Sequence, residues 1–174
     1  TLCGQTNIAS GATIGSNHNS RSPDGEMIAG RGFWPGLCSD FKHNSRFASF
    51  VLVAKGSYEH ELNITYPFSL VISNGCNQDI SIIPAYWFLY NMYAVTRNKF
   101  KFQKRDKRVV KVQHIETDPL APDTIQEVIA AVDRIIELTG RYLLNIRDAR
   151  AVGAANHDEL HQIAKEIGRA SCRE

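Results

Sequence analysis

The sequence predicts a mainly β fold: a parallel β-helix made of six-residue repeats, followed by α-helices. Aliphatic or aromatic residues recur every six positions over residues 2–58, and a short fixed period of this kind is typical of a β-helix. Residues 59–83 read as extended chain with one hairpin, and residues 84–166 carry helical patterns. These three segments, followed by a separate tail over 167–174, are the predicted organisation of the chain.

The repeat is clearest as blocks of six residues, each with a small residue usually in its fifth place. The pattern is interrupted over Ser20–Met27, a polar stretch that reads as a loop, and one extra residue, Asp40, shifts its phase. We expect the opening side chains to point into a core and the small residues to let the backbone turn. Ordinary short strands joined by Gly-rich turns are the alternative. The blocks open at Leu2, Ile8, Ile14, Ile28, Trp34, Phe41, Phe47 and Val53.

Two short apolar runs and a long aromatic run follow the repeat. Leu70–Ile72 and Ile80–Ile83 flank the turn dipeptide Asn74-Gly75, which predicts a hairpin. From Pro84 to about Phe102 the sequence predicts a helix that is apolar nearly all round until Val95, and such a helix is buried on several sides. Packing against the β-helix or a neighbouring subunit is favoured over a stacking platform for a ligand.

The only dense charge block lies between Arg97 and Lys111, with eight Lys or Arg residues and a single acid, Asp106. Phosphate groups of a nucleotide or coenzyme A, or nucleic acid, are the ligands that such a block attracts. A solvated helix end is the competing interpretation. Nucleic acid is the least favoured partner because the net charge is only +2 and no nucleic-acid-binding motif accompanies the block.

The C-terminal part predicts one more amphipathic helix. Asp123–Gln126 resembles a capping box that opens it, and Gly140 ends its apolar pattern. Further on, His157 and His161 are four residues apart. We expect a surface helix there, with no metal site and no bound cofactor.

Composition and the chain ends restrict the class of protein. Of 174 residues, 43% are hydrophobic, but no apolar run approaches the roughly 20 residues of a membrane-spanning helix, so no membrane partner is expected. Cysteines without CxxC spacing favour a reducing cytoplasm. Residues 167–174 read as a translated sequencing adapter, so we expect a fragment whose natural sequence ends near Glu166.

Three sequences carry a resemblance to a known family: Thr6–Arg21, Gly30–Gly36 and Pro84–Tyr93. With the six-residue period, they resemble the hexapeptide-repeat superfamily of left-handed parallel β-helices, whose best-known members are acyltransferases. The sequence of these segments is similar to that of a bacterial family, domain-of-unknown-function family 4954, and the resemblance covers residues 1 to about 150. The resemblance implies a left-handed coil, appended helices and a homotrimer, and supplies no catalytic residues.

The tetrapeptide His-Asn-Ser-Arg occurs twice, at His18–Arg21 and His43–Arg46. His18 occupies a fifth place, where the repeat requires a small residue, directly before the predicted loop. His43 occupies a third place, where side chains can face outward. The two copies can lie on neighbouring coils, but they are not equivalent positions of the repeat.

The resemblance implies a role for these histidines. In hexapeptide acyltransferases a His near an extruded loop removes a proton from the acceptor, which then attacks an acyl thioester. His18 is the predicted general base, with His43 second. Backbone N–H groups at Gly30 or Gly32 would stabilise the oxyanion. The other predicted substrate- or anion-binding residues are Asn19, Arg21, Asp24, Arg31, Asn44 and Arg46.

The sequence therefore predicts an acyltransferase-like protein that uses acyl-CoA as cosubstrate and a small or sugar-type acceptor. Two alternatives stay open. One is a non-catalytic trimeric scaffold or small-ligand-binding protein, in which the polar tetrapeptides only hold loops. The other is part of a nucleotide-sugar-processing enzyme, whose transferase domain would lie in another part of the protein.

Overall fold

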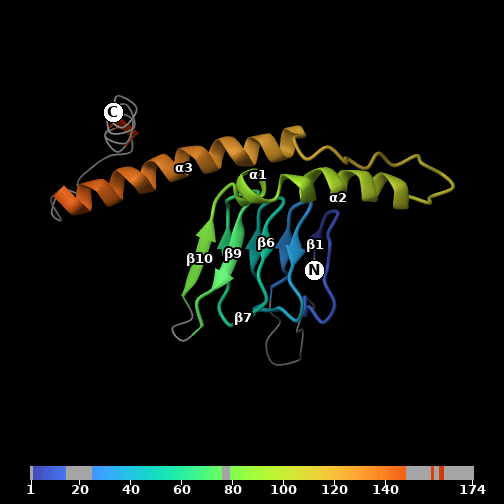
Figure 1. Cartoon of the computed structure of the whole chain (residues 1–174), viewed down its shortest axis with the longest axis horizontal. Coiled ribbons are helices and arrows are strands. Elements are labelled where there is room, and N and C mark those ends of the chain that lie inside the picture. Colours follow the sequence, from blue (N-terminus) through green and yellow to red (C-terminus); the bar gives the residue numbers. More distant parts are fainter. Residues whose placement is uncertain (1, 15–24, 76–78, 148–157, 159–160, 163–174) are drawn as a thin grey trace. The chain divides into compact units, whose positions relative to one another are not determined.

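The computed structural model describes residues 2–14, 25–75, 79–147, 158 and 161–162, without the side chains of 145–147. The chain divides into two compact units, Thr1–Glu127 and Val128–Glu174, and each is described by itself. The described part consists mainly of short strands with appended helices (Figure 1). The predicted mainly β class with added helices is thereby confirmed.

The strands of the first unit form three sheets. The first sheet contains β1 (Leu2–Cys3), β2 (Ile28–Ala29), β5 (Arg46–Phe47) and β8 (Asn63–Ile64). The second contains β3 (Trp34–Pro35), β6 (Leu52–Val53), β9 (Leu70–Ser73) and β10 (Ile80–Ile83). The third contains β4 (Asp40–Phe41) and β7 (Ser57–Tyr58).

Successive strands from β2 to β9 visit the three sheets in rotation, and each strand from β2 to β6 pairs in parallel with the strand three ahead. Ile28 pairs with Arg46, and Asp40 with Ser57; one such passage through the three sheets is called a coil below. Among the described strands, β9 and β10 form the only antiparallel pair, and it lies where the sequence predicted a hairpin. Parallel pairing between coils continues through β8 and β9. It therefore extends past residue 58, where we had predicted that the repeat ends.

The core of this unit is built from the second residue of each short strand. Ala29, Pro35, Phe41, Phe47 and Val53 are all buried and lie six residues apart. A second set of buried side chains comes four residues after these positions: Phe33, Ser39, Ser45 and Val51. The Phe33 and Phe47 rings stack with centroids 4.6 Å apart, so neighbouring coils interlock through their side chains.

These inward positions correct the predicted phase of the repeat. We expected Ile28 and Trp34 to face the core and Asp40 to be an extra residue. Instead Ile28 is 39% exposed, and the smaller Ala29 and Pro35 face inward, so the spacing of six runs unbroken across Asp40. At Ala29 the physical reason is volume, because this small side chain leaves room for the Phe47 ring, which is paired with it on the adjacent coil.

Two other residues lie outside their predicted surroundings. Met27, which we assigned to the interrupting loop, is 2% exposed and belongs to the core. The Trp34 side chain lies on the outer face of β3 and contacts Trp87, with ring centroids 6.0 Å apart in an edge-on arrangement. An indole on the outer face of the second sheet thus forms the support for the first helix.

Helices α1 (Tyr86–Tyr90) and α2 (Met92–Arg105) lie along one end of the strands (Figure 1). We predicted a helix buried on several sides, and for the described residues this is wrong. Trp87, Ala94 and Val95 are buried, whereas Tyr90 and Tyr93 are 73% and 76% exposed. The helix also breaks at Asn91, between α1 and α2, so only one face covers the strands.

Helix α3 (Pro122–Arg147) begins in the first unit and continues through the second. Pro122 occupies its first position, where a missing N–H costs nothing, so Asp123 lies inside the helix and is not its cap. The helix also continues through Gly140, where we predicted its end. In the second unit Glu137 pairs with Arg134 at 2.7 Å and Arg141 at 2.8 Å.

Two kinds of feature are absent from the described residues. No helix in the described part of the chain is long and apolar enough to cross a membrane. No group of three or more His, Cys, Asp or Glu side chains is placed to hold a metal ion among the same residues. His157 lies outside the residues that the structure describes.

The corrected phase predicts opposite tolerances at two adjacent positions. Ala29→Asp would place a carboxylate in the core and should lower the free energy of unfolding by about 3 kcal/mol or more. Ile28→Asp should cost no more than about 1 kcal/mol, because its side chain is on the outer face of a strand. Urea unfolding of both variants measures this. Equal destabilisation by the two variants would contradict the phase.

Candidate anion-binding site

One corner of the coil carries a ladder of residues in the left-handed backbone conformation. Gly32, Phe50 and Phe68 have φ values of 71°, 56° and 57°, and they occupy the same position in three successive coils. Their N–H groups bond to the coil before them, for example Phe50 to the carbonyl of Arg31 at 2.6 Å. A Cβ on Gly32 would come within 2.2 Å of the Phe50 ring, so this position requires glycine.

A cavity of about 690 Å³ lies between this corner, helix α2 and the segment that follows the helix. The strands contribute Gln5, Thr6, Asn7, Gly32 and Phe50. Helix α2 contributes Val95, Asn98, Lys99, Lys101, Phe102 and Arg105. The following segment contributes Asp106, Lys107, Arg108, Ile115, Thr117 and Pro119. Because an apolar floor lies beside several cations, the cavity suits an anion that carries an apolar or planar body.

The segment after α2 is fastened to both other walls. The Gln5 side-chain amide donates a hydrogen bond to the carbonyl of Glu116. Lys99 forms an ion pair with Asp118 at 2.9 Å. Gln103 donates a hydrogen bond of 3.1 Å to the Thr117 hydroxyl. The outer wall is therefore held by side chains from the coil and the helix together.

Arg31 makes the most extensive of these attachments. Its Nε and Nη2 both donate to the Asp123 carboxylate at 2.8 Å, and Nη1 donates to the carbonyl of Asp118 at 2.9 Å. Nη2 also bonds to the Thr124 hydroxyl at 2.8 Å. Its guanidinium carbon lies 5.7 Å from the centroid of the Phe50 ring, within range of a cation–π contact. All three nitrogens are engaged, although we had predicted Arg31 as a substrate ligand.

Ion pairing lowers the pKa of several carboxyl groups around the cavity. The hydrogen bonds from Arg31 hold the pKa of Asp123 below its ordinary value. Hydrogen bonds from Arg108 at 2.9 Å hold the pKa of Asp106 well below its ordinary range. Hydrogen bonding from Lys99 likewise lowers the pKa of Asp118. These acids are therefore ionised at neutral pH and committed to particular cations.

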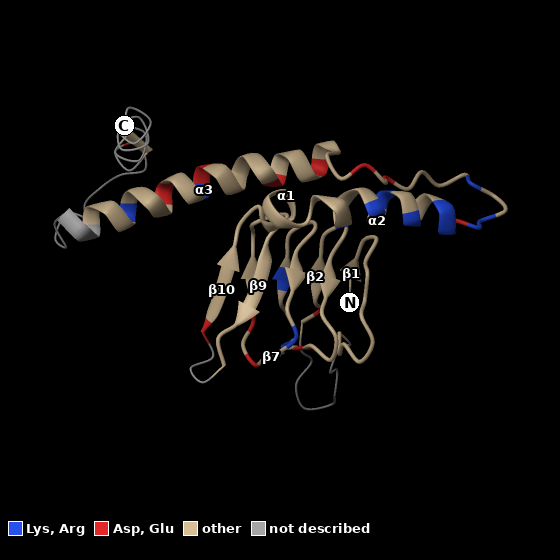
Figure 2. Cartoon of the chain, in the orientation of Figure 1, with Lys and Arg blue, Asp and Glu red and all other residues tan. Residues whose placement is uncertain are grey.

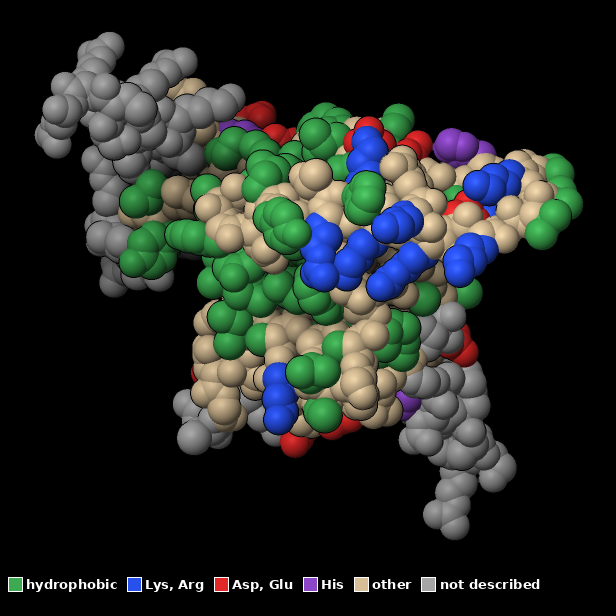
Figure 3. Space-filling model, turned by 45° about the vertical axis from the view of Figure 1, so that its right-hand side comes forward, with side chains coloured by type: hydrophobic (Ala, Val, Ile, Leu, Met, Phe, Trp, Pro, Cys, Tyr) green, Lys and Arg blue, Asp and Glu red, His purple; other side chains and the backbone are tan. Residues whose placement is uncertain are grey.

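Other cations of the same region remain unpaired in the described structure. Lys101, Arg105 and Lys107 line the cavity, and within the described ranges their side chains form no ion pair or hydrogen bond. Burial, followed by the nearby charges of Arg97 and Arg105, lowers the pKa of Lys101. Lys and Arg residues gather along the second half of α2 and beyond it (Figure 2), and Lys and Arg side chains form a group on one face of the molecule (Figure 3). The rim of the cavity is thus strongly positive.

The first His-Asn-Ser-Arg copy lies outside the described residues. His18, Asn19, Arg21 and Asp24 all belong to residues 15–24, of which the structure describes nothing. Their predicted roles stay predictions.

The second copy forms the turn from β4 to β5. Asn44 has a φ of 68° and is exposed, His43 is half-buried, and Arg46 is exposed on β5. Gly25 approaches this turn so closely that a Cβ on it would lie 2.6 Å from Asn44 Oδ1. Gly25 therefore lies directly beside the second copy.

His43 and the cationic cavity lie at different corners of the coil. His43 follows the third sheet, whereas Gly32 and Phe50 follow the first. The predicted oxyanion donors are also occupied, since Gly30 N–H bonds to the carbonyl of Phe47 and Gly32 N–H to that of Gln5. Of the sequence predictions that fall on described residues, the basic segment and Gly32 are the ones that line this cavity.

The strand side of the cavity was missed from sequence. Gln5 and Asn7 are ordinary polar residues of a repeat, and Phe50 was counted only as part of a block. The available signal was the return of the chain after three six-residue units, which places Gly32 and Phe50 at the same corner once the phase is known. Without that phase, nothing in the sequence links the basic segment to these residues.

Comparisons with known proteins give a relative without an assigned activity. No protein-family model matches the chain, and no solved structure matches it. The chain is 57% identical over 137 residues to a protein of Treponema pallidum (strain Nichols) described as an uncharacterized protein. The match covers 77% of this chain but only 19% of that protein. The chain thus has a bacterial relative and spans about a fifth of that relative's length.

The Arg31–Asp123 pair predicts a pH-dependent stability. Because the folded pKa of Asp123 is lowered, its contribution is present at neutral pH and is lost as pH falls through that folded value. Asp123→Asn should therefore destabilise the protein near pH 7, and the difference from wild type should shrink below about pH 4. Urea unfolding across this range measures the effect. Asp133→Asn, on the exposed part of α3, is the control, and a difference independent of pH would contradict the role of the pair.

Proposed function

We propose that this chain is part of an acyltransferase-like protein with a left-handed parallel β-helix. It would transfer an acyl group from acyl-CoA to a small or sugar-type acceptor. The observation that supports this most directly is the cavity at the coil corner, where unpaired cations lie beside an apolar floor. Coenzyme A has phosphates and a planar base, which are the groups that such a cavity accepts.

The arrangement of strands supports the architectural part of this proposal. Three sheets visited in rotation, with each strand paired in parallel to the strand three ahead, are what a three-sided coil of six-residue units requires. The left-handed sense is proposed from the family resemblance. The same resemblance proposes a homotrimer, in which neighbouring subunits would complete the groove for the donor and acceptor.

The proposed chemistry uses the histidine turns. A neutral imidazole, His18 with His43 second, would take a proton from the acceptor hydroxyl or amine. The acceptor would attack the thioester carbonyl carbon, the carbon–sulfur bond would break, and the thiolate would leave and receive a proton. Asn19 or Asp24 would orient the imidazole. The remaining predicted contacts to substrate are Arg21, Asn44 and Arg46, while Arg31 would act through the wall that it anchors.

The separation of His43 from the cavity is compatible with this chemistry. In acyl-CoA the flexible pantetheine arm separates the thioester from the phosphates, so the two sites need not coincide. The same separation also favours one alternative, a non-catalytic small-ligand-binding or scaffold protein that uses the cavity alone. A nucleotide-sugar-processing enzyme would use the cavity in a similar way, since its substrate carries a diphosphate.

The acyl-transfer proposal makes a kinetic prediction in the natural full-length protein. Replacing a general base typically slows the reaction by about 10²- to 10⁴-fold, so His18→Ala should do so, with His43→Ala having the smaller effect. Thiol release from acetyl-CoA, measured over a set of hydroxyl and amine acceptors, gives the rate. His114→Ala, whose side chain is 84% exposed, is the control. A double variant of His18 and His43 as fast as wild type would end this assignment.

A further inference from the structure

We infer that Lys101, Arg105 and Lys107 bind the diphosphate of a ligand whose remaining body is planar or apolar and occupies the rest of the cavity. This chemistry is shared by nucleoside diphosphates and coenzyme A. The inference deepens the proposed function, because in acyl-CoA the diphosphate would belong to the donor. It also applies to a ligand-binding protein without catalysis.

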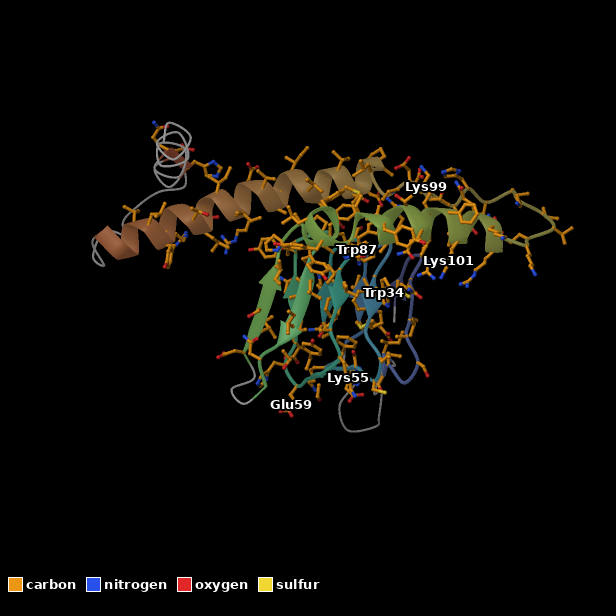
Figure 4. All side chains as sticks on the ribbon, viewed as in Figure 1. Trp34, Lys55, Glu59, Trp87, Lys99 and Lys101 are labelled. Atoms are coloured by element: carbon orange, nitrogen blue, oxygen red, sulfur yellow. The ribbon has the colours of Figure 1, made fainter. Side chains whose placement is uncertain are left out.

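Internal pairing selects these cations from the larger basic segment. Lys99 is paired with Asp118 at 2.9 Å, and Arg108 and Lys111 share Asp106 at 2.9 and 3.9 Å. Lys104 lies 5.8 Å from the centroid of the Phe100 ring. Lys101, Arg105 and Lys107 are the cavity-lining cations left without a carboxylate among the described residues. Figure 4 shows Lys99 and Lys101 leaving α2 on different sides, in agreement with these separate roles.

The spacing of cations on α2 is unfavourable without an anion. Arg97, Lys101 and Arg105 lie at successive intervals of four residues, and like charges at this spacing destabilise a helix. Burial is the main cause of the lowered pKa of Lys101, and repulsion from Arg97 and Arg105 adds to it. A phosphate group bound between Lys101 and Arg105 would replace this repulsion with charge-assisted hydrogen bonds.

The remainder of the cavity indicates a ligand larger than an isolated phosphate. Its volume of about 690 Å³ falls within the range of roughly 300–1,000 Å³ that small-molecule sites occupy. Phe102, Ile115 and Val95 line its apolar part, and the amides of Gln5 and Asn98 lie on its wall. These groups fit a planar base or aliphatic chain with a few hydrogen-bonding atoms.

The position of the three cations in a cavity distinguishes this site from a surface that binds nucleic acid. A nucleic-acid surface presents its cations along an exposed face that follows many phosphates. Here the three cations line one cavity bounded by the segment that Arg31 and Gln5 hold in place. Such a site accommodates one diphosphate with its substituent. Binding of a nucleic-acid polymer instead would be detected by the oligonucleotide in the experiment below.

Titration calorimetry of the full chain tests the inference with ADP, coenzyme A, pyrophosphate, adenosine and a single-stranded oligonucleotide. ADP and coenzyme A should bind, pyrophosphate more weakly, and adenosine weakest. The double variant Lys101→Gln with Arg105→Gln should weaken ADP binding by at least about tenfold, since it removes two charge-assisted contacts. Lys107→Gln should weaken it less. Lys55→Gln, a matched loss of charge at the end of the strands opposite α2 (Figure 4), should change nothing.

Three results would overturn the inference: ADP binding unchanged by the double variant, adenosine binding as tight as ADP, or tighter binding of the oligonucleotide than of ADP. Far-ultraviolet circular dichroism and melting temperature verify that each variant is folded. The proposed function fails separately. ADP binding with no acyl transfer in the full-length protein leaves the diphosphate site standing, whereas acyl transfer unaffected by the double variant removes the site alone.

Proton uptake provides a second test. Because its lowered pKa leaves Lys101 partly deprotonated at alkaline pH, a bound diphosphate should restore the ammonium form and take up a proton. Calorimetry in buffers of different ionisation enthalpy should show net proton uptake that decreases as the pH is lowered, because Lys101 then carries its proton before the ligand binds. Lys101→Arg should bind ADP without this uptake. Equal uptake by that variant would assign the proton to another group.

Discussion

Parallel pairing of each strand with the strand three ahead is the constraint on which the rest of the first unit depends. It fixes which side chains meet between coils, so Phe33 lies against Phe47 and Phe50 against Phe68. It also places the residues with a left-handed backbone conformation, Gly32, Phe50 and Phe68, above one another at a single corner. Helices α1 and α2 lie along that corner, and the cavity is formed where α2 passes over it. The site is therefore a consequence of register, since a shift of one residue would turn Phe50 and Gly32 away from α2.

The cations around this corner form two groups, paired and unpaired. Arg31, Lys99 and Arg108 are paired with Asp123, Asp118 and Asp106, and these pairs hold the outer wall. Lys101, Arg105 and Lys107 face the cavity without such partners in the described structure. A helix that only needed solvation would not place part of its charge in a concave space beside aromatic residues. The paired cations give the basic segment a structural role, and the unpaired cations are the ones that we propose bind the ligand.

The sequence was sufficient for the fold class but not for the site. The six-residue period predicted strands in parallel order, and the turn dipeptide Asn74-Gly75 between two apolar runs predicted the β9–β10 hairpin. The phase failed at Ile28 and Trp34 because size suggested burial, whereas the core needed small residues there. Contacts such as Arg31 with Asp123 join residues 92 positions apart, and no local pattern encodes them. The basic segment was recognised from composition, but its partner surface depended on tertiary structure.

Phe50 and Phe68 adopt a backbone conformation that bulky residues seldom occupy, with φ values of 56° and 57°. Each carries a penalty of about 1–2 kcal/mol, and their parallel rings, with centroids 4.8 Å apart, help to offset it. Phe50 can leave this arrangement only by separating from Phe68 and from the Arg31 guanidinium. The floor of the cavity is thus preorganised: a ligand that enters finds the surface already shaped and loses little affinity to rearrangement of the protein.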